Sequence, residues 1–188
     1  MKDSPVKKST WIALAIFAAG IVILDQVTKA LTVKYIPAFG DVAVIPNILH
    51  LTFVHNEGAA FSLLSGMRWL FVVLVVVYFA VLAWLIVKKV IGKPFELWCL
   101  AAVSGGAVGN LIDRVATGKV VDMIVLKFLY LPLPSITDGH LKFTMTPFAV
   151  FNIADCFITC GVIALVVYVL FFCKEEKSAK EPKNEADM

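Results

Sequence analysis

Residues 105–114 read GGAVGNLIDR, and residues 120–122 read VVD. The first stretch closes an apolar run and ends in polar and charged residues. Its glycines offer small faces on which another helix can pack closely. Its polar residues follow the spacing i, i+3, i+4, which places them on one face of a helix. They are Asn110, Asp113 and Arg114. The stretch predicts a tightly packed helix with a site at its end, and Asp122 follows soon after.

A second stretch of similar character is FNIAD at residues 151–155. It lies inside the apolar run 148–173, in which Asp155 is the only charged residue. Asn152 and Asp155 are three positions apart and therefore share a helix face. Charged groups within membrane segments usually face the protein interior and mark function. Asp155 is therefore a second candidate for the same site.

The composition indicates an integral membrane protein of the all-α class. The 188 residues are 60% hydrophobic and only 16% charged, whereas soluble domains carry about 25% charged residues. The length fits one membrane domain, residues 1–188. The net charge of +3 is small, and nothing in its distribution suggests nucleic-acid binding. The four cysteines show neither a disulfide framework nor the spacing of a zinc site.

Four apolar runs are long enough to cross a bilayer. They cover residues 11–33, 69–87, 95–111 and 148–173. The remaining segments are polar or punctuated by proline and glycine, which predicts connections outside the membrane. These are a β-region at 34–68, a loop at 112–147 and a cytoplasmic tail at 174–188.

The segment 34–68 combines strand patterns with a block of small residues. Val42–Ile45 and Leu49–His55 predict two short strands. The block Asn56–Ser62 contains Gly58, and small residues let a backbone approach a ligand closely. His50 and His55 have no further ligands nearby in the sequence, so no metal site is expected.

The distribution of lysines predicts the orientation in the membrane. Basic residues are concentrated before the first span, in the turn at 88–93 and in the tail, so the positive-inside rule places both termini in the cytoplasm. Asp25 and Lys29, one helical turn apart, can then pair near the outer end of the first span. Polar groups of three helices meet Asp122 at that level, and chance placement would scatter them. This coincidence predicts an active site at the extracytoplasmic face.

Two aspartates in such a site predict acid–base hydrolysis. Two carboxylates close together share a proton, because both cannot ionise. The ionised one can take a proton from water, and the protonated one can donate to the carbonyl oxygen of a peptide bond. No serine or cysteine has a plausible histidine partner at this level. The pattern alone does not decide which aspartates form the catalytic pair. The candidates are Asp25, Asp113, Asp122 and Asp155.

The chain resembles the lipoprotein signal peptidase family (signal peptidase II), bacterial aspartic proteases that remove signal peptides from prolipoproteins. The resemblance covers about residues 11–173 and rests on five blocks in order. They are Asp25–Lys29, Asn56–Ser62, Gly105–Arg114, Val120–Asp122 and Phe151–Asp155.

The resemblance implies a role for each candidate residue. The implied catalytic pair is Asp122 and Asp155. The residues implied to bind or orient the substrate are Asn56, Asn110, Arg114 and Asn152. Those implied to support the structure are Asp25, Lys29, Asp113 and Gly58. No metal or cofactor is implied.

The resemblance also implies a substrate, a fold and a location. The substrate is a membrane-inserted signal peptide with diacylglyceryl on the cysteine directly after the cut. The fold is four transmembrane helices, a small extracytoplasmic β-sheet from residues 34–68, and a short mobile helix or lid within 115–147. The protein is expected to be a monomer in the bacterial inner membrane, in contact with membrane lipid, and to bind the inhibitor globomycin in the same cleft.

Two features depart from the family pattern. Met123 follows Asp122 where phenylalanine is expected, and the segment 127–147 is long for the family. Both departures bear on the shape of the lid and on substrate preference.

The main alternative is a proton-coupled transporter or structural membrane subunit, although no internal repeat is found. The other is a presenilin-type protease, whose Gly-x-Gly-Asp and Tyr-Asp motifs are absent.

Overall fold

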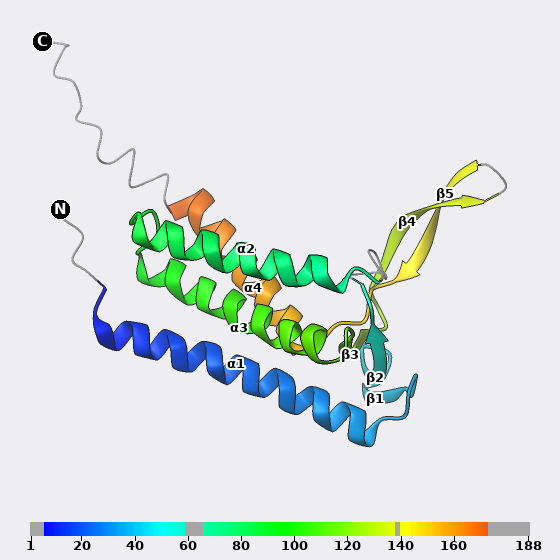
Figure 1. Ribbon diagram of the computed structural model, residues 1–188. Helices are drawn as coiled ribbons and strands as arrows, with labels where there is room; N and C mark the ends of the chain where they lie inside the picture. Colours follow the sequence, from blue (N-terminus) through cyan, green and yellow to red (C-terminus); the bar gives the residue numbers. More distant parts are fainter. Residues whose placement is uncertain (1–5, 59–65, 138–139, 173–188) are drawn as a thin grey trace, which may run out of the picture.

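The computed structural model describes residues 6–58, 66–137 and 140–172, with the backbone alone for 131–147. Residues 59–62 of the small-residue block and the tail from Lys174 lie outside this part of the chain. In the described part, four helices are long and apolar enough to cross a membrane. They are α1 (Lys8–Tyr35), α2 (Arg68–Val87), α3 (Pro94–Ala116) and α4 (Ile153–Val167), which continues as a π-helical turn over Tyr168–Phe172 (Figure 1). The expectation of four membrane helices with a small sheet is confirmed.

The central helix of the bundle is α3, against which both α1 and α4 pack. Glycines make this close approach possible. A Cβ atom on Gly106 would lie 2.5 Å from the carbonyl oxygen of Ala154 in α4. One on Gly109 would lie 2.6 Å from the Asp25 carboxylate in α1. The contact with α2 differs, because α2 contains no buried residue and packs mainly against α3.

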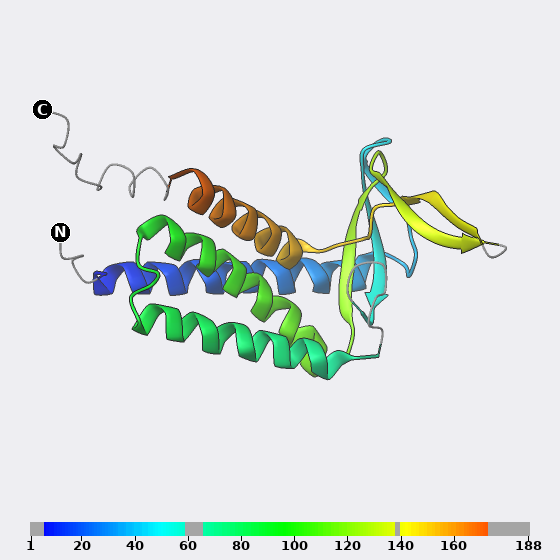
Figure 2. The same cartoon turned by 90° about the horizontal axis from the view of Figure 1, so that it is seen from above.

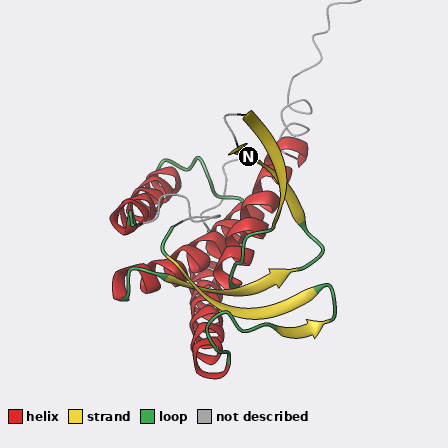
Figure 3. Ribbon diagram, turned by 90° about the vertical axis from the view of Figure 1, so that its right-hand side faces the viewer, coloured by secondary structure: helices red, strands yellow, loops and turns green. Residues whose placement is uncertain are grey.

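A three-stranded antiparallel sheet closes one end of the bundle. Its order is β1 (Val42–Ile45), β2 (Leu49–Asn56) and β3 (Val120–Leu126). The third strand comes from the loop after α3, so the expectation of a sheet built from 34–68 alone is corrected. Figure 3 shows the strands crossing in front of the helix ends. Strand β3 therefore places Asp122 over the ends of α1 and α3.

In the segment 115–147, where a short mobile helix or lid was expected, the described residues include a β-hairpin and no helix beyond the end of α3. Strands β4 (Tyr130–Thr137) and β5 (His140–Pro147) pair with each other and project away from the bundle (Figure 1). No helix is found in 117–137 or 140–147. Pro132 and Pro134 explain the difference, because proline in a helix interior removes a hydrogen bond and clashes with the preceding turn.

The fourth helix begins at Ile153 rather than at Phe148, the start of the apolar run. Phe151 is held in extended conformation by β3: its amide donates to the carbonyl of Ile124 (3.2 Å), and the amide of Ile124 donates back (2.8 Å). The third helix, in contrast, continues past Leu111 to Ala116. Both changes bring polar residues to the ends of helices beneath the sheet.

The two ends of the bundle differ in character. The start of α1, the α2–α3 turn and the end of α4 lie at one end, and the sheet lies at the other (Figures 1 and 2). The lysines of the turn, Lys88 and Lys89, therefore lie far from the sheet, whereas the candidate site residues lie beneath it.

Candidate active site

Asp122 lies on β3, with only 2% of its surface exposed. Its Oδ2 accepts a hydrogen bond from Asn56 Nδ2 (2.8 Å), and its Oδ1 accepts one from Asn152 Nδ2 (2.7 Å). The sheet register explains the first contact. Val54 is directly opposite Asp122, so Asn56, two residues further along β2, is a diagonal neighbour within reach.

Asp155 lies in the first turn of α4 and completes a capping box with Asn152. Its backbone amide donates to Asn152 Oδ1 (3.0 Å), and its Oδ2 accepts from the backbone amide of Asn152 (3.1 Å). Its Oδ1 accepts from Asn110 Nδ2 in α3 (2.7 Å). Asn152 therefore bridges the two acids, because its side chain contacts Asp122 while its backbone contacts Asp155.

Three asparagines present their NH₂ groups to the two carboxylates, and unambiguous donors fix these orientations. The amide oxygen of Asn56 accepts from the backbone N–H of Gly58 (2.9 Å). That of Asn152 accepts from the backbone of Asp155, and that of Asn110 accepts from Lys29 Nζ (3.0 Å). Backbone amides and ammonium groups only donate. Each amide nitrogen must therefore face an acid, and every carboxylate oxygen of the pair accepts one hydrogen bond.

Lys29 is the buried cation beneath this layer, with 3% of its surface exposed. Its ammonium group lies 2.8 Å from both Asp25 Oδ2 and Asp113 Oδ2, in addition to its contact with Asn110. An ammonium group has three donors, so all three have partners. The predicted pairing of Asp25 with Lys29 is present in the structure, with Asp113 as a second partner.

Asp25 and Asp113 connect the helices to the site. Asp25 is fully buried, and its Oδ1 accepts from the backbone amide of Ala154 at the start of α4 (2.9 Å). Asp113 Oδ2 accepts from the backbone amide of Val121, directly before Asp122 (3.3 Å). Both carboxylates are thus ion-paired and hydrogen-bonded within the bundle. Neither lines the cleft beside Asp122 and Asp155 that is described below.

Arg114 forms the side of the site that faces α2. Its guanidinium donates to the carbonyl of Gly58 (3.1 Å) and lies 4.3 Å from the centre of the Phe71 ring. It thereby ties α3 to the segment that follows β2. Gly58, which the resemblance places among the supporting residues, is buried between Asn56 and Arg114.

A cleft of about 430 Å³ opens beside the two aspartates. Asn56, Asn110 and Arg114 line it together with the acids, whereas Phe148–Phe151 and the Cys156–Cys160 face of α4 provide apolar walls. An apolar cavity with a few converging polar groups is typical of a ligand site. Among the described residues, no cluster of three or more His, Cys, Asp or Glu side chains is arranged to hold a metal ion.

Burial raises the pKa of Asp122 to about 6, and the negative charge of Asp155 adds to the rise. The hydrogen bonds from Asn56 and Asn152 act in the opposite direction, because they stabilise the ionised form. Asp122 therefore holds or releases a proton near neutral pH, which suits a general acid or base.

Two residues of the site were not predicted from the sequence. Gln26 Nε2 lies within hydrogen-bonding distance of Asp113 Oδ1 (3.0 Å) and the carbonyl of Gly109 (3.1 Å). Thr32 donates to the sulfur of Met123 (3.2 Å), the residue that departs from the family pattern. The signal for Thr32 is periodicity, because it lies one turn beyond Lys29 on the buried face of α1.

Comparison with known proteins gives consistent results. A family model described as signal peptidase (SPase) II matches residues 17–171. A lipoprotein signal peptidase of Caldanaerobacter subterraneus is 39% identical over 156 residues, which is 83% of this chain and 94% of that protein. One of Geobacillus kaustophilus is 37% identical over 163 residues, or 85% and 94% of the two chains.

Solved structures agree with the sequence relatives. One, described as a bacterial membrane enzyme, superposes with a TM-score of 0.72 at 31% identity and covers 91% of this chain and 93% of its own. A second of the same description gives a TM-score of 0.69 at 32% identity, covering 85% and 94%.

Proposed function

Because the chain belongs to the signal peptidase II family, we propose that Asp122 and Asp155 are the pair that cuts the signal peptide from a prolipoprotein. Family membership makes the protein an aspartic endopeptidase of lipoprotein processing and a multi-pass membrane protein. The choice of these two acids rests on one observation: Asn152 contacts both carboxylates, and both acids line the cleft. Asp25 and Asp113 are instead paired with Lys29.

The proposed reaction needs one proton shared between the two acids. With one acid ionised, a water molecule loses a proton to it while attacking the peptide carbonyl. The protonated acid donates to the carbonyl oxygen, and the tetrahedral intermediate collapses with proton transfer to the leaving amine. Asp122 and Asp155 interact, so their apparent pKa values belong to the pair. The transporter alternative finds no support, because the family model and the curated relatives are those of a peptidase.

The remaining residues take positioning roles in this proposal. Asn56, Asn110 and Asn152 orient the acids, and each is already hydrogen-bonded to a carboxylate. Arg114, at the wall of the cleft, is the group best placed to bind a substrate carbonyl. A signal peptide must unwind at the cut, and such a donor can satisfy a freed backbone carbonyl.

The proposed substrate carries diacylglyceryl on the cysteine after the cut. Its acyl chains stay in the membrane, since each buried CH₂ contributes about 0.8 kcal/mol to membrane binding. The scissile bond therefore lies near the interface, where the sheet end of the bundle is proposed to face the extracytoplasmic side. A monomer suffices, because one chain provides both acids, and a globomycin-type inhibitor is expected to occupy the same cleft.

The test is a cleavage assay with purified protein in detergent. A lipobox peptide with diacylglyceryl cysteine should be cut directly before the cysteine, and the same peptide without lipid should not. Asp122→Asn and Asp155→Asn should each reduce the rate to background while the unfolding temperature stays near that of the wild type. Wild-type rates in either variant would remove that acid from the pair.

A further inference from the structure

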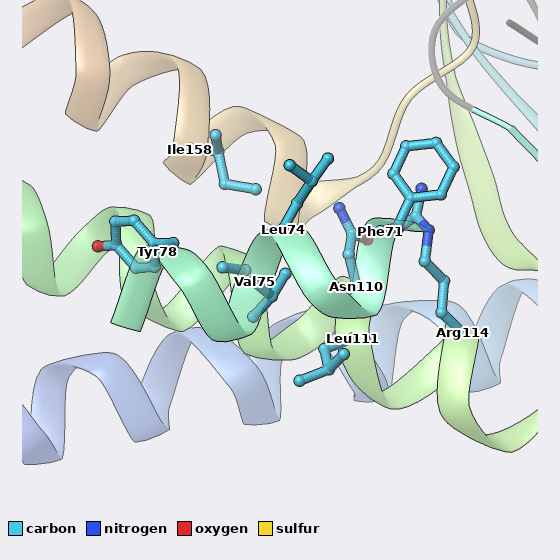
Figure 4. Close-up of a pocket in the computed structure, with 9 residues that line it drawn as sticks. Phe71, Leu74, Val75, Tyr78, Asn110, Leu111, Arg114 and Ile158 are labelled. Atoms are coloured by element: carbon cyan, nitrogen blue, oxygen red, sulfur yellow. The ribbon is translucent and has the colours of Figure 1, made fainter. Parts of the chain in front are cut away.

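A second, smaller cavity adjoins the cleft and is not needed for the acid–base chemistry. It has a volume of about 270 Å³ and lies between α2, α3 and Ile158 of α4. Apart from Asn110 and Arg114 its lining is formed by aliphatic and aromatic residues, with Phe71, Leu74 and Tyr78 from α2 (Figure 4). We refer to it as the α2 groove.

The α2 groove is continuous with the cleft that holds the acids. Asn110 and Arg114 line both cavities. Arg114 lies at the junction, because its guanidinium covers the Phe71 ring of the groove and also donates to Gly58 beside the cleft. A molecule lying in the groove can therefore extend past Arg114 toward Asp155.

The groove opens toward lipid rather than toward water. The helix that forms its outer wall, α2, has no buried residue, and Leu74 is 53% exposed. The Tyr78 hydroxyl hydrogen-bonds to α3, donating to the carbonyl of Leu100 (3.2 Å) and pairing with Ser104 Oγ (2.9 Å). Tyr78 thus presents only its ring to the groove, at the end away from Arg114 (Figure 4).

The length and the lining of the groove indicate its occupant. From Phe71 to Tyr78 it extends over seven residue steps of α2, or about 10 Å at 1.5 Å per residue. Apart from Asn110 and Arg114 at the junction with the cleft, the lining offers no hydrogen-bonding side chain besides Tyr78, whose hydroxyl is bonded to α3. This lining suits a hydrocarbon chain, whereas an unwound peptide segment would find no partners in it for its backbone N–H and C=O groups.

We propose that the α2 groove binds one acyl chain of the diacylglyceryl group of the substrate and thereby aligns the modified cysteine with the acids. This inference rests on the proposed function, because it assumes that the lipid is attached next to the cut. Lipid tails are as apolar as the groove lining, so the chain gains little affinity on entering. The benefit is orientation, and it is expected in kcat more than in KM.

Two tryptophan variants on the same helix test the groove. Leu74→Trp fills it, and since α2 has no buried residue, the protein should still fold. Val76→Trp is the matched control: Val76 is 60% exposed and lies outside the groove lining. Leu74→Trp should lower kcat for the diacylglyceryl peptide on the order of 10- to 100-fold with little change in KM, and Val76→Trp should leave both unchanged. Equal rates in both variants would overturn the acyl site and leave the proposed reaction intact.

Photo-crosslinking detects an acyl chain bound in the α2 groove independently of cleavage. The probe is the same lipopeptide with a diazirine in one acyl chain, added to full-length Asp122→Asn protein. Labels should map to Phe71–Tyr78 and disappear in Leu74→Trp. Labels in the groove without cleavage by the wild type would support the acyl site and contradict the reaction.

Three labelling results would overturn the proposal. One is a label spread over the lipid-facing surface. Another is groove labelling by a diazirine in the peptide segment. The third is groove labelling by a diazirine phospholipid that the lipopeptide does not displace.

Discussion

Asn110 illustrates how a residue without chemistry of its own determines the geometry of the acids. Its amide oxygen accepts from Lys29 and from Asn152 (3.1 Å), so only its nitrogen can face Asp155. If the amide were reversed, a nitrogen would face the Lys29 ammonium and an oxygen would face a carboxylate. Lys29 therefore acts on Asp155 through Asn110 without touching it.

Lys29→Ala tests how much Lys29 contributes to the stability of the folded protein. The substitution leaves two buried carboxylates, Asp25 and Asp113, without their cation, and breaking a buried ion pair costs about 3–5 kcal/mol. The unfolding temperature in detergent should fall strongly. The control is Lys119→Ala, which breaks the exposed pair with Glu57 (2.7 Å), worth at most about 1 kcal/mol. A Lys29→Ala protein that is as stable as the wild type yet inactive would contradict this role.

The pH dependence of cleavage should follow the hydrogen bond from Asn56 to Asp122. Because burial raises the pKa of Asp122 to about 6, kcat/KM should fall as the pH rises above the higher apparent pKa of the pair. Asn56→Ala removes a bond that stabilises ionised Asp122, so the pKa of Asp122 rises further. The alkaline limb of the profile should therefore move to higher pH, and Lys119→Ala should leave it in place. A shift to lower pH would contradict this account.

The raised pKa of Asp122 also predicts how the stability of the folded protein changes with pH. The folded protein binds the proton of Asp122 more tightly than the unfolded chain does, since its pKa is raised from 3.8 to about 6. Its ionisation therefore opposes folding. This contribution costs stability above about pH 6 and is relieved as the pH falls toward 3.8.

At the scale of elements, the close packing of α3 against α4 positions Asp155 relative to Asn110. Gly106 lies against the backbone of Ala154, directly before Asp155. Any side chain at position 106 would push the start of α4 away from α3, and with it the Asn110–Asp155 hydrogen bond.

Gly106→Ala should therefore lower both the unfolding temperature and the cleavage rate. The added methyl group would lie 2.5 Å from the Ala154 carbonyl oxygen, a contact that requires the backbone to move. Overpacking of this kind costs about 1–3 kcal/mol. Gly20→Ala in α1 is the matched control: nothing lies within 4 Å of its Cβ, and alanine favours a helix over glycine by about 0.5–1 kcal/mol. Equal effects of both substitutions would show that the α3–α4 contact is not close enough to matter.

The elements that the sequence predicts well are those with local signals. The four helices follow from apolar runs, and β1 from its β-branched residues. The third strand and the Phe151 bridge depend on pairing between distant segments, for which no local pattern exists. For the same reason Asn152 was expected within a helix, whereas β3 holds Phe151 in extended conformation and makes Asn152 the N-cap. The candidate acids could be chosen only through the family resemblance, since spacing alone left four aspartates open.

At the scale of the whole molecule, the buried charges of the site are confined to one end. Asp25, Lys29 and Asp113 lie beneath the sheet, Asp122 lies on it, and the opposite end carries the basic α2–α3 turn. This asymmetry matches a substrate whose cut lies at one membrane face. It also predicts the orientation of the bundle, because short basic loops are retained in the cytoplasm.

Reporter fusions test that orientation. Alkaline phosphatase is active only after export, so a fusion after Gly118, in the turn between α3 and β3, should be active. A fusion after Val90, in the turn between α2 and α3, should be inactive, whereas green fluorescent protein at that position should fluoresce. The sheet end carries basic residues too, but they are spread over several segments, whereas Lys88, Lys89 and Lys93 are concentrated in one short turn. The reverse pattern would place the acids at the cytoplasmic face, out of reach of an exported prolipoprotein, and would contradict the proposed site together with the orientation.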